Sequence, residues 1–494
     1  MTAFSRRRFL EAAALLAASS PLAGCVSRAR GAAPMDAVAM AEAVRTGKTS
    51  ASALVEAAIA QLEKVNPKIN AVAFPNFDRA RAQAAANPTG PLGGVPTLIK
   101  DITPQQGLPY TSGVRAYRAR LGDRTAPYIE AVERMGVVSI GRSTSPEFGL
   151  TATTEPLLTG PSRNPWNLDH STGGSSGGSG AAVAAGVVPI AHASDGGGSI
   201  RIPASVNGLV GLKPSRGRMT GATGDRDVTK VSVNNCLSRT VRDTAAWFAA
   251  TEAPGADARF APVGVVTGPS ARRLRIGTHL ARGDGSLPHE DVQNIFSNAA
   301  LLLERLGHRV ADQPLAYDGT KAAEAFQILW GAGAAQDIQE VATYLGRRPG
   351  PEDLEPLTFA MAGVAQKAGE AGVRNAIATL TDVANRYNAQ FETIDIYMTP
   401  VLALPPVPIG FLATTQPYEV QSERLTSYVA YTPLENVAGA PSIALPMGVS
   451  RDGLPIGIQF ATKPGGERTL LELAYELERE LEWYRKTPPL WVGA

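Results

Sequence analysis

The chain has 494 residues, 44% of them hydrophobic and 19% charged, which is a globular composition with enough apolar material for a large core. Its formal net charge is only +2, and Arg6, Arg7 and Arg8 against Glu11 account for all of it. This balance, without a basic stripe or an acidic tail, argues against nucleic acid and against a cationic partner.

The first 33 residues have the pattern of an export signal. The sequence SRRRFL at 5–10 matches the twin-arginine motif, and an alanine- and leucine-rich run follows to Leu22. LAGC at 22–25 matches a lipobox, which makes Cys25 a candidate lipid anchor; a cleavage site near 29–33 and a plain amphipathic helix are the alternatives. We therefore expect export by the twin-arginine route to the periplasm, as a free protein or a membrane-anchored lipoprotein. The second cysteine, Cys236, is then left without an intramolecular disulfide partner.

Beyond the signal, helical and strand patterns alternate. Apolar spacing predicts two helices over residues 36–65, separated at 47–50, with Thr49 or Ser50 as the cap of the second. Further helices are predicted over residues 80–86, 128–135, 240–251, 289–306, most of 318–394, and 467–481. Strands are predicted over residues 69–74, 97–99, 137–140, 209–212, 274–277, 394–398, 441–445 and 456–460, with a short buried helix entering a strand over 181–190. This alternation indicates an α/β fold.

Two glycine-rich stretches stand out, GGSSGGSG at 173–180 and SDGGGSIRIP at 194–203. Glycine loses more backbone entropy on folding than any other residue, so two such loops close together are not expected to be mere connections. They suit a place where the backbone approaches a bound molecule and serine hydroxyls lie among exposed N–H groups. That combination is typical of an acyl-transfer site.

Three other chemistries fit the sequence poorly. The five histidines show no metal-ligand spacing. The pattern G-x-S-x-G at 174–178 centres on Ser176, but residues 164–171 have turn composition where a strand is needed, and no histidine follows His308. The glycines at 196–198 do not complete a dinucleotide-binding motif, because Arg201 stands at the third glycine position.

A serine activated by a lysine is the remaining chemistry. Lys100 ends a short apolar strand preceded by glycines, so its side chain is a candidate to point inward. Burial disfavours the ammonium form and would leave a neutral amine able to accept a serine proton. The N–H groups of Gly196, Gly197, Gly198 and Ser199 could then form an oxyanion hole.

These stretches resemble the amidase signature family. The resemblance extends over residues 36–485 and is carried by GVPTLIKD at 94–101, GGSSGGS at 173–179 and DGGGSIR at 195–201, with support from NVAGAP at 436–441 and GLPIGIQ at 453–459. It implies an α/β fold in which a single large domain, residues 34–494, has a mixed central β-sheet covered by helices on both faces. Its core would comprise residues of about 65–250 and 430–490, with a substrate-pocket insertion at about 310–430.

The resemblance also implies a catalytic triad. Ser199 would be the nucleophile, Ser175 the bridging serine after a cis peptide bond, and Lys100 the base. Ser176 would be a supporting hydroxyl, and Asp195 and Arg201 a pair that braces the loop, with a plain surface ion pair as the alternative for Arg201.

The implied function is hydrolysis of a small-molecule carboxylic amide, without metal or cofactor. The chain is most similar to bacterial amidases that act on linear or cyclic amides, including nylon-oligomer hydrolases. The alternatives are a glutaminase-type transamidation subunit and a non-catalytic binding protein on the same scaffold, and a homodimer is considered beside a monomer. The sequence identifies no substrate-binding residue: Phe326 and Trp330 permit an apolar or aryl acyl group but fit a core position as well.

Overall fold

The computed structural model describes residues 35–255 and 258–493, and the structural statements below concern those residues. The expected signal peptide at 1–33, with Cys25, lies outside them. Within the described ranges, no helix combines the length and apolar character needed to cross a membrane.

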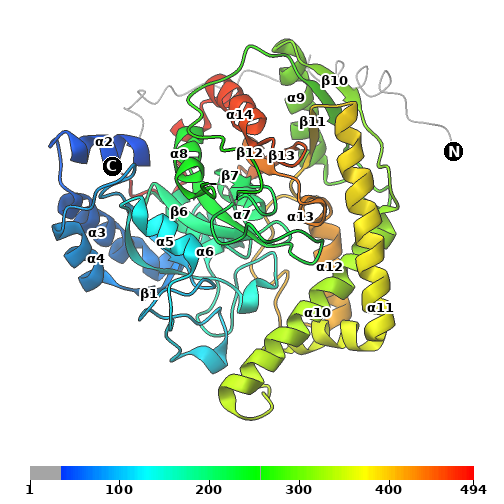
Figure 1. Ribbon diagram of the computed structural model, residues 1–494, viewed down its shortest axis with the longest axis horizontal. Coiled ribbons are helices and arrows are strands. Elements are labelled where there is room, and N and C mark those ends of the chain that lie inside the picture. The colour runs from blue at the N-terminus through cyan, green and yellow to red at the C-terminus, as the bar shows by residue number, and fades with distance from the viewer. Residues whose placement is uncertain (1–34, 256–257, 494) are drawn as a thin grey trace. The chain divides into compact units, whose positions relative to one another are not determined.

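The core is a mixed eight-stranded sheet (Figure 1). β10, β9 and β11 run parallel to one another, and every other neighbouring pair is antiparallel. In spatial order the strands are β10 (Arg309–Asp312), β9 (Arg275–Thr278), β11 (Ile396–Pro400), β13 (Pro455–Ala461), β12 (Ser442–Val449), β7 (Val210–Lys213), β8 (Val233–Ser238) and β6 (Ile190–Asp195).

Helices cover both faces of this sheet because its strands are apolar on both sides. Along β12, Ile443 and Leu445 pack into one buried cluster and Ala444 into another, as expected from the alternation of side chains along a strand. The first cluster includes α8 (Val241–Thr251), α9 (Glu290–Arg305) and α14 (Glu467–Leu481); the second includes α3 (Ala51–Ile69), α6 (Gly177–Ala184) and α7 (Arg201–Asn207). The predicted fold class is thereby confirmed.

A small three-stranded sheet lies beside β6. It consists of β1 (Val72–Pro75), β3 (Val138–Ser143) and β2 (Pro96–Lys100), in that order. The Thr97 hydroxyl of β2 donates to the Ile190 carbonyl at 2.9 Å, and the Lys100 N–H donates to His192 Nδ1 at 3.2 Å. These contacts hold the end of β2 against β6. The neighbouring helices are α2 (Ala37–Arg45), α4 (Phe77–Ala85) and α5 (Pro127–Arg134).

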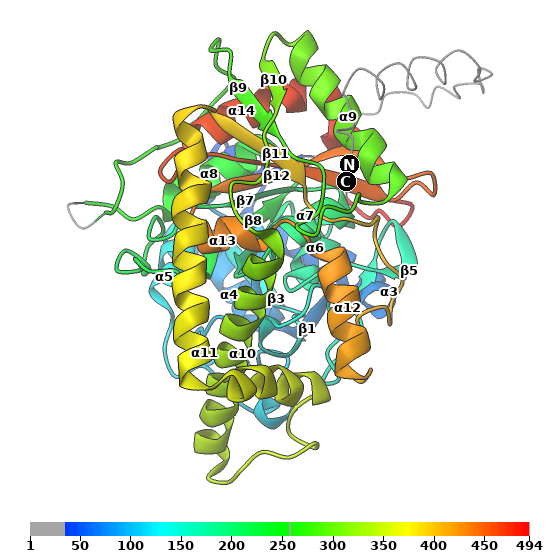
Figure 2. The same ribbon diagram turned by 90° about the vertical axis from the view of Figure 1, so that its right-hand side faces the viewer.

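The segments before and after β11 in the sequence are largely helical. α10 (Gly319–Leu345) and α11 (Pro356–Ala389) pack side by side, with α12 (Tyr418–Tyr428) nearby, as Figure 2 shows, and α13 (Pro433–Ala438) follows. A side chain on Gly331 of α10 would collide with the Met361 carbonyl of α11, so glycine permits this close packing. The remaining elements are β4 (Arg163–Asn164), β5 (Asn167–Ser171) and the 3-10 turns Arg115–Tyr117, Glu147–Gly149, Gln390–Glu392 and Trp483–Arg485.

Most predicted elements are present, but α7, β10, α12 and α13 were not predicted, and several predictions need correction. Ser50 caps α3, and α14 has the predicted bounds. α3 continues to Ile69, so the strand predicted over 69–74 begins only at Val72. β8 (Val233–Ser238) was not predicted, because its central asparagines disguise a strand. Residues 164–171 form a short hairpin rather than a turn, so that reason for rejecting a Ser176 nucleophile was wrong.

Candidate active site

Lys100 lies at the end of β2 with its side chain fully buried. Its Nζ donates to Ser175 Oγ at 2.7 Å and to Ser194 Oγ at 3.0 Å. The structure thus brings the expected base and the expected bridging serine into direct contact. Ser194 was not predicted to take part, although it lies inside the second glycine-rich stretch.

Burial lowers the pKa of Lys100 to about 7, against the opposing effect of the Asp195 charge. A large fraction of this lysine is therefore a neutral amine at neutral pH, and a neutral amine can accept a proton. Lys213 is a second buried lysine, whose pKa is also lowered to about 7, by burial and then by Arg201. Its Nζ donates to the Pro214 carbonyl at 2.9 Å and forms no hydrogen bond with a serine of the described residues.

Ser175 lies in the turn before α6, and the peptide bond between Gly174 and Ser175 is cis, as the sequence resemblance implied. The next residue ties this turn to β6. The Ser176 hydroxyl donates to the Ser194 carbonyl at 3.2 Å and accepts from the Ser194 N–H at 3.4 Å. Ser176 therefore bonds to backbone and not to a histidine, which is the structural reason to reject it as a nucleophile.

Ser199 lies in the turn between β6 and α7. Only 9% of its surface is exposed, and it lines a cavity together with Gly174 and Gly197. No hydrogen bond to another described residue occupies its hydroxyl. The expected nucleophile thus faces the space that a substrate would fill.

Asp195 organises this turn by accepting backbone N–H groups. The Gly198 N–H donates to Oδ1 at 2.8 Å and the Ile200 N–H to Oδ2 at 3.1 Å. Gly198 has a φ of 130°, which favours glycine. Its N–H points at Asp195, so Gly198 is withdrawn from the expected oxyanion hole. The N–H groups of Gly196, Gly197 and Ser199 have no partner within the described chain and remain candidates.

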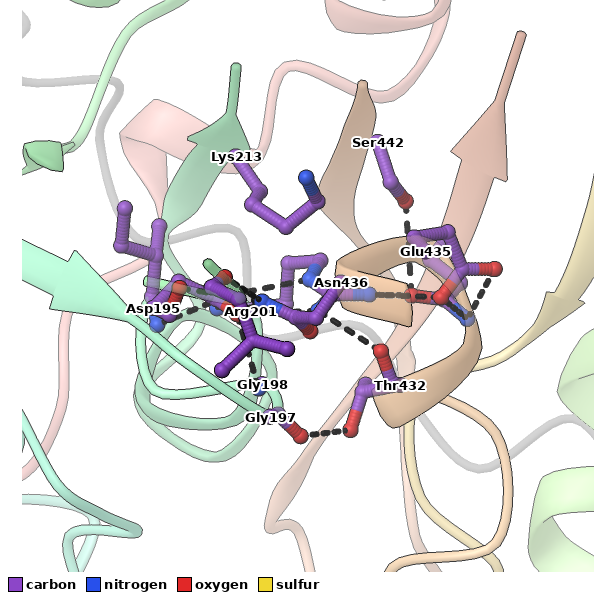
Figure 3. Close-up of polar contacts among 12 residues, drawn as sticks. Asp195, Gly197, Gly198, Arg201, Lys213, Thr432, Glu435, Asn436 and Ser442 are labelled. Carbon is purple, nitrogen blue, oxygen red and sulfur yellow. Dashed lines mark hydrogen bonds and ion pairs between the residues drawn. The ribbon is translucent and has the colours of Figure 1, made fainter. Parts of the chain in front are cut away.

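Thr432 holds the carbonyl end of the peptide unit that joins Gly197 to Gly198. Its hydroxyl donates to the Gly197 carbonyl at 2.7 Å, while the N–H of that unit, from Gly198, donates to Asp195 (Figure 3). A side chain on Gly198 would collide with Thr432. The peptide plane is therefore clamped at both ends, and this limits how the adjacent N–H groups can rotate.

Arg201 is fully buried, so the alternative of a surface ion pair is wrong. Its guanidinium donates to both carboxylate oxygens of Asp195 at 2.9 and 3.0 Å and to Glu435 Oε2 at 2.8 Å. Its remaining acceptors are Gln459 Oε1, Asn436 Oδ1 and the Thr432 carbonyl. Figure 3 shows this arginine between the β6–α7 turn and α13. Asn436 and Gln459 lie in the two C-terminal stretches of the sequence resemblance.

The two carboxyl groups that accept from Arg201, those of Asp195 and Glu435, have pKa values shifted in opposite directions. Burial opposes ionisation of Asp195, but the charge and hydrogen bonds of Arg201 outweigh it and hold the pKa of that carboxyl well below its usual range. Burial raises the pKa of Glu435, with Arg201 opposing. Asp195 therefore stays ionised as the main acceptor of the turn.

The cavity in front of Ser199 has a volume of about 620 Å³. Phe326 and Trp330 of α10 line it and stack with ring centroids 5.4 Å apart. A side chain on Gly196 would come within 3.1 Å of the Trp330 ring, and one on Gly197 within 3.3 Å of Phe326. The aromatic pair thus borders the loop that carries Ser199. Residues of α12, which lies within 310–430, and of α13, which lies just after it, also line the cavity.

Comparison with known proteins identifies the family. The family model described as Amidase matches residues 53–471. The chain belongs to the amidase family. The putative amidase AmiC of Mycobacterium tuberculosis is 42% identical over 463 residues, covering 92% of this chain and 96% of that protein. The 6-aminohexanoate-cyclic-dimer hydrolase of Paenarthrobacter ureafaciens is 36% identical, with the same two coverages.

Solved structures agree with the sequence relatives. A 6-aminohexanoate cyclic dimer hydrolase complexed with substrate superimposes with a TM-score of 0.84 at 33% identity, covering 92% of this chain and 98% of that one. A bacterial aryl acylamidase of the amidase signature family gives a TM-score of 0.81 at 27% identity, covering 92% and 98%. This amidase is therefore a hydrolase acting on amide bonds, and these relatives do not favour the transamidation alternative.

Proposed function

We propose that this amidase cleaves a carboxylic amide through an acyl-enzyme on Ser199, with Ser175 and Lys100 as the proton relay. The observation that carries the proposal is the contact of 2.7 Å between Lys100 Nζ and Ser175 Oγ. It lies in a buried setting that brings the lysine pKa to about 7, beside the cavity that Ser199 lines.

The Lys100–Ser175 contact supports the first proton transfer of the proposed reaction. Neutral Lys100 accepts the Ser175 proton while Ser175 accepts that of Ser199, and Ser199 Oγ forms a bond to the amide carbon. The N–H groups of Gly197 and Ser199, with Gly196 as a further candidate, stabilise the oxyanion. When the C–N bond breaks, Ser175 returns a proton to the leaving amine and Lys100 reprotonates Ser175. Water then attacks the ester by the same relay and releases the acid and Ser199.

The cavity wall supports an apolar group next to the scissile amide. Phe326 and Trp330 border the nucleophile loop, so an aryl or alkyl part of the substrate would be covered by their rings. Binding of this kind positions the carbonyl without adding charge at the reacting centre.

The test is a labelling and turnover experiment on the purified protein. A fluorophosphonate probe should modify Ser199, as located by mass spectrometry, and an amide substrate should slow the modification. Ser199→Ala should lose both labelling and turnover, the latter by about 10⁴-fold or more. Ser297→Ala, at a hydroxyl of α9 that donates to the Gln293 carbonyl, is the matched control and should behave as wild type. Turnover in Ser199→Ala close to that of wild type would refute the proposal.

A further inference from the structure

One face of α12 contains a polar residue where the pattern calls for an apolar one. Tyr418, Gln421, Leu425 and Tyr428 recur at helical spacing. Tyr418 and Leu425 pack in the same cluster as Trp330. Gln421 lies between them on that face and lines the cavity that contains Ser199.

The carboxamide of Gln421 is buried without any partner. The residue is 1% exposed, and neither Nε2 nor Oε1 forms a hydrogen bond with another described residue. A carboxamide offers two donors and one acceptor with two lone pairs, and burying them unpaired costs free energy. Leucine or methionine would fill the same position without that cost, so the residue suits a group that enters from outside.

The surroundings indicate that this group is neutral. The buried carboxylate of the lining, Glu435, already accepts from Arg201 and Tyr387. The Tyr317 hydroxyl, also part of the lining, is buried and unpartnered like Gln421, and it is neutral as well. The other charged residues of the lining are not buried: Asp284, Glu324 and Glu423 are exposed, and the half-buried Arg282 pairs with Asp284 at 3.4 Å. Within the described lining no buried charge is therefore left free for an ionic substrate group. An amide, which presents C=O and N–H together, matches both functions of the glutamine.

Trp330 lies beside both the loop that carries Ser199 and the face of α12 that carries Gln421. Its ring borders Gly196 of the nucleophile loop on one side and belongs to the cluster of Tyr418 and Leu425 on the other. A group that reaches Gln421 from Ser199 therefore passes along an aromatic surface. An apolar spacer suits that surface.

We propose that Gln421 binds a second amide of the substrate, so that this enzyme prefers compounds in which an apolar spacer separates two amide groups. The inference rests on the amide hydrolysis proposed above and deepens it. Gln421 is a specificity residue in this scheme and takes no part in bond breaking.

The experiment compares two substrates in a series of spacer lengths. One has a second secondary amide beyond the spacer, and the other has a hydrocarbon of equal length in its place. Wild-type kcat/KM should favour the diamide by at least about 10-fold at the best spacer. Gln421→Met should reduce this ratio to about one, mainly through KM of the diamide, with Tm equal to or above that of wild type. Gln336→Met, at an exposed site of α10 outside the cavity, should keep the wild-type ratio.

The outcomes separate the two proposals. Hydrolysis of both substrates without preference, or a preference that survives in Gln421→Met, overturns the role of Gln421 alone. Equal loss of both activities with a lower Tm in that variant would assign Gln421 a structural role and also overturn it. No hydrolysis of any substrate by wild type would refute the proposed function and this inference with it.

Discussion

Lys100 and Arg201 are both buried basic residues, but their surroundings shift their pKa values in opposite directions. Lys100 has hydroxyl groups as its Nζ partners, so burial lowers its pKa to about 7. Arg201 contacts two carboxylates, and those charges, despite burial, hold its pKa above the usual value. One residue can exchange a proton at neutral pH, while the other stays charged and supports the turn.

The pKa of Lys100 gives a pH prediction. The neutral amine is the active form, so kcat/KM should be low below pH 6, rise through a midpoint of about 7 and level off above it. Lys100→Arg should show no such rise at any pH, because a guanidinium stays protonated. Initial rates in buffers of constant ionic strength provide the check. A flat wild-type profile across neutral pH would contradict Lys100 as the base.

The site residues that the sequence predicted all lie in short motifs. Lys100, Ser175 and Ser199 belong to compact motifs, in which type and spacing are read directly. Thr432 and Gln421 have no such motif, and the Thr432 contact joins residues 235 positions apart in the chain. A single threonine or glutamine carries no signal in sequence that reveals such a partner.

At the scale of elements, the β6–α7 turn is held by α13. Asp195 and Thr432 clamp the peptide unit between Gly197 and Gly198, and Asn436 Nδ2 donates to both the carbonyl and a carboxylate oxygen of Asp195. The turn thus depends on a short helix near the C-terminus. The proposed oxyanion donors are thus positioned by this packing rather than by the turn alone.

Removing one end of the clamp should lower activity without unfolding the protein. Thr432→Val deletes the hydroxyl that donates to the Gly197 carbonyl, and we expect kcat to fall about 10- to 100-fold with KM little changed. Thr432→Ser should recover most of the activity because it restores the donor. Thr381→Val, at an exposed hydroxyl of α11, controls for the substitution itself. Circular dichroism and steady-state kinetics measure both effects, and a KM effect alone would argue against the clamp.

At the scale of the whole molecule, segments distant in sequence meet around one cavity. The loop that carries Ser199 lies at the end of β6, while α10, α12 and α13 supply much of the cavity lining. Figure 2 shows these three helices on the same side of the molecule. The sheet carries Asp195 at the end of β6, and the helical region between β10 and β12 lines much of the cavity. Variation in that region could change the substrate without disturbing the triad.

Export also belongs to this scale and remains a proposal. Replacing Arg6 and Arg7 with lysine keeps the charge but removes the arginine pair that the export receptor recognises, so the protein should stay in the cytoplasm. Cys25→Ala should leave export intact but release the protein from the membrane if Cys25 carries the lipid. Cell fractionation with immunoblotting distinguishes these results. Unchanged distribution of the double lysine variant would exclude the twin-arginine route.

The sequence by itself determined the α/β fold class and the family and predicted the triad, because periodic apolar positions and glycine–serine motifs are local properties of the chain. The burial that lowers the pKa of Lys100, the turning of the Gly198 N–H toward Asp195, and the placing of Thr432 and Gln421 beside Ser199 were decided only by the tertiary structure. These features depend on contacts between segments far apart in sequence and on exclusion of water, and neither exists until the chain has folded.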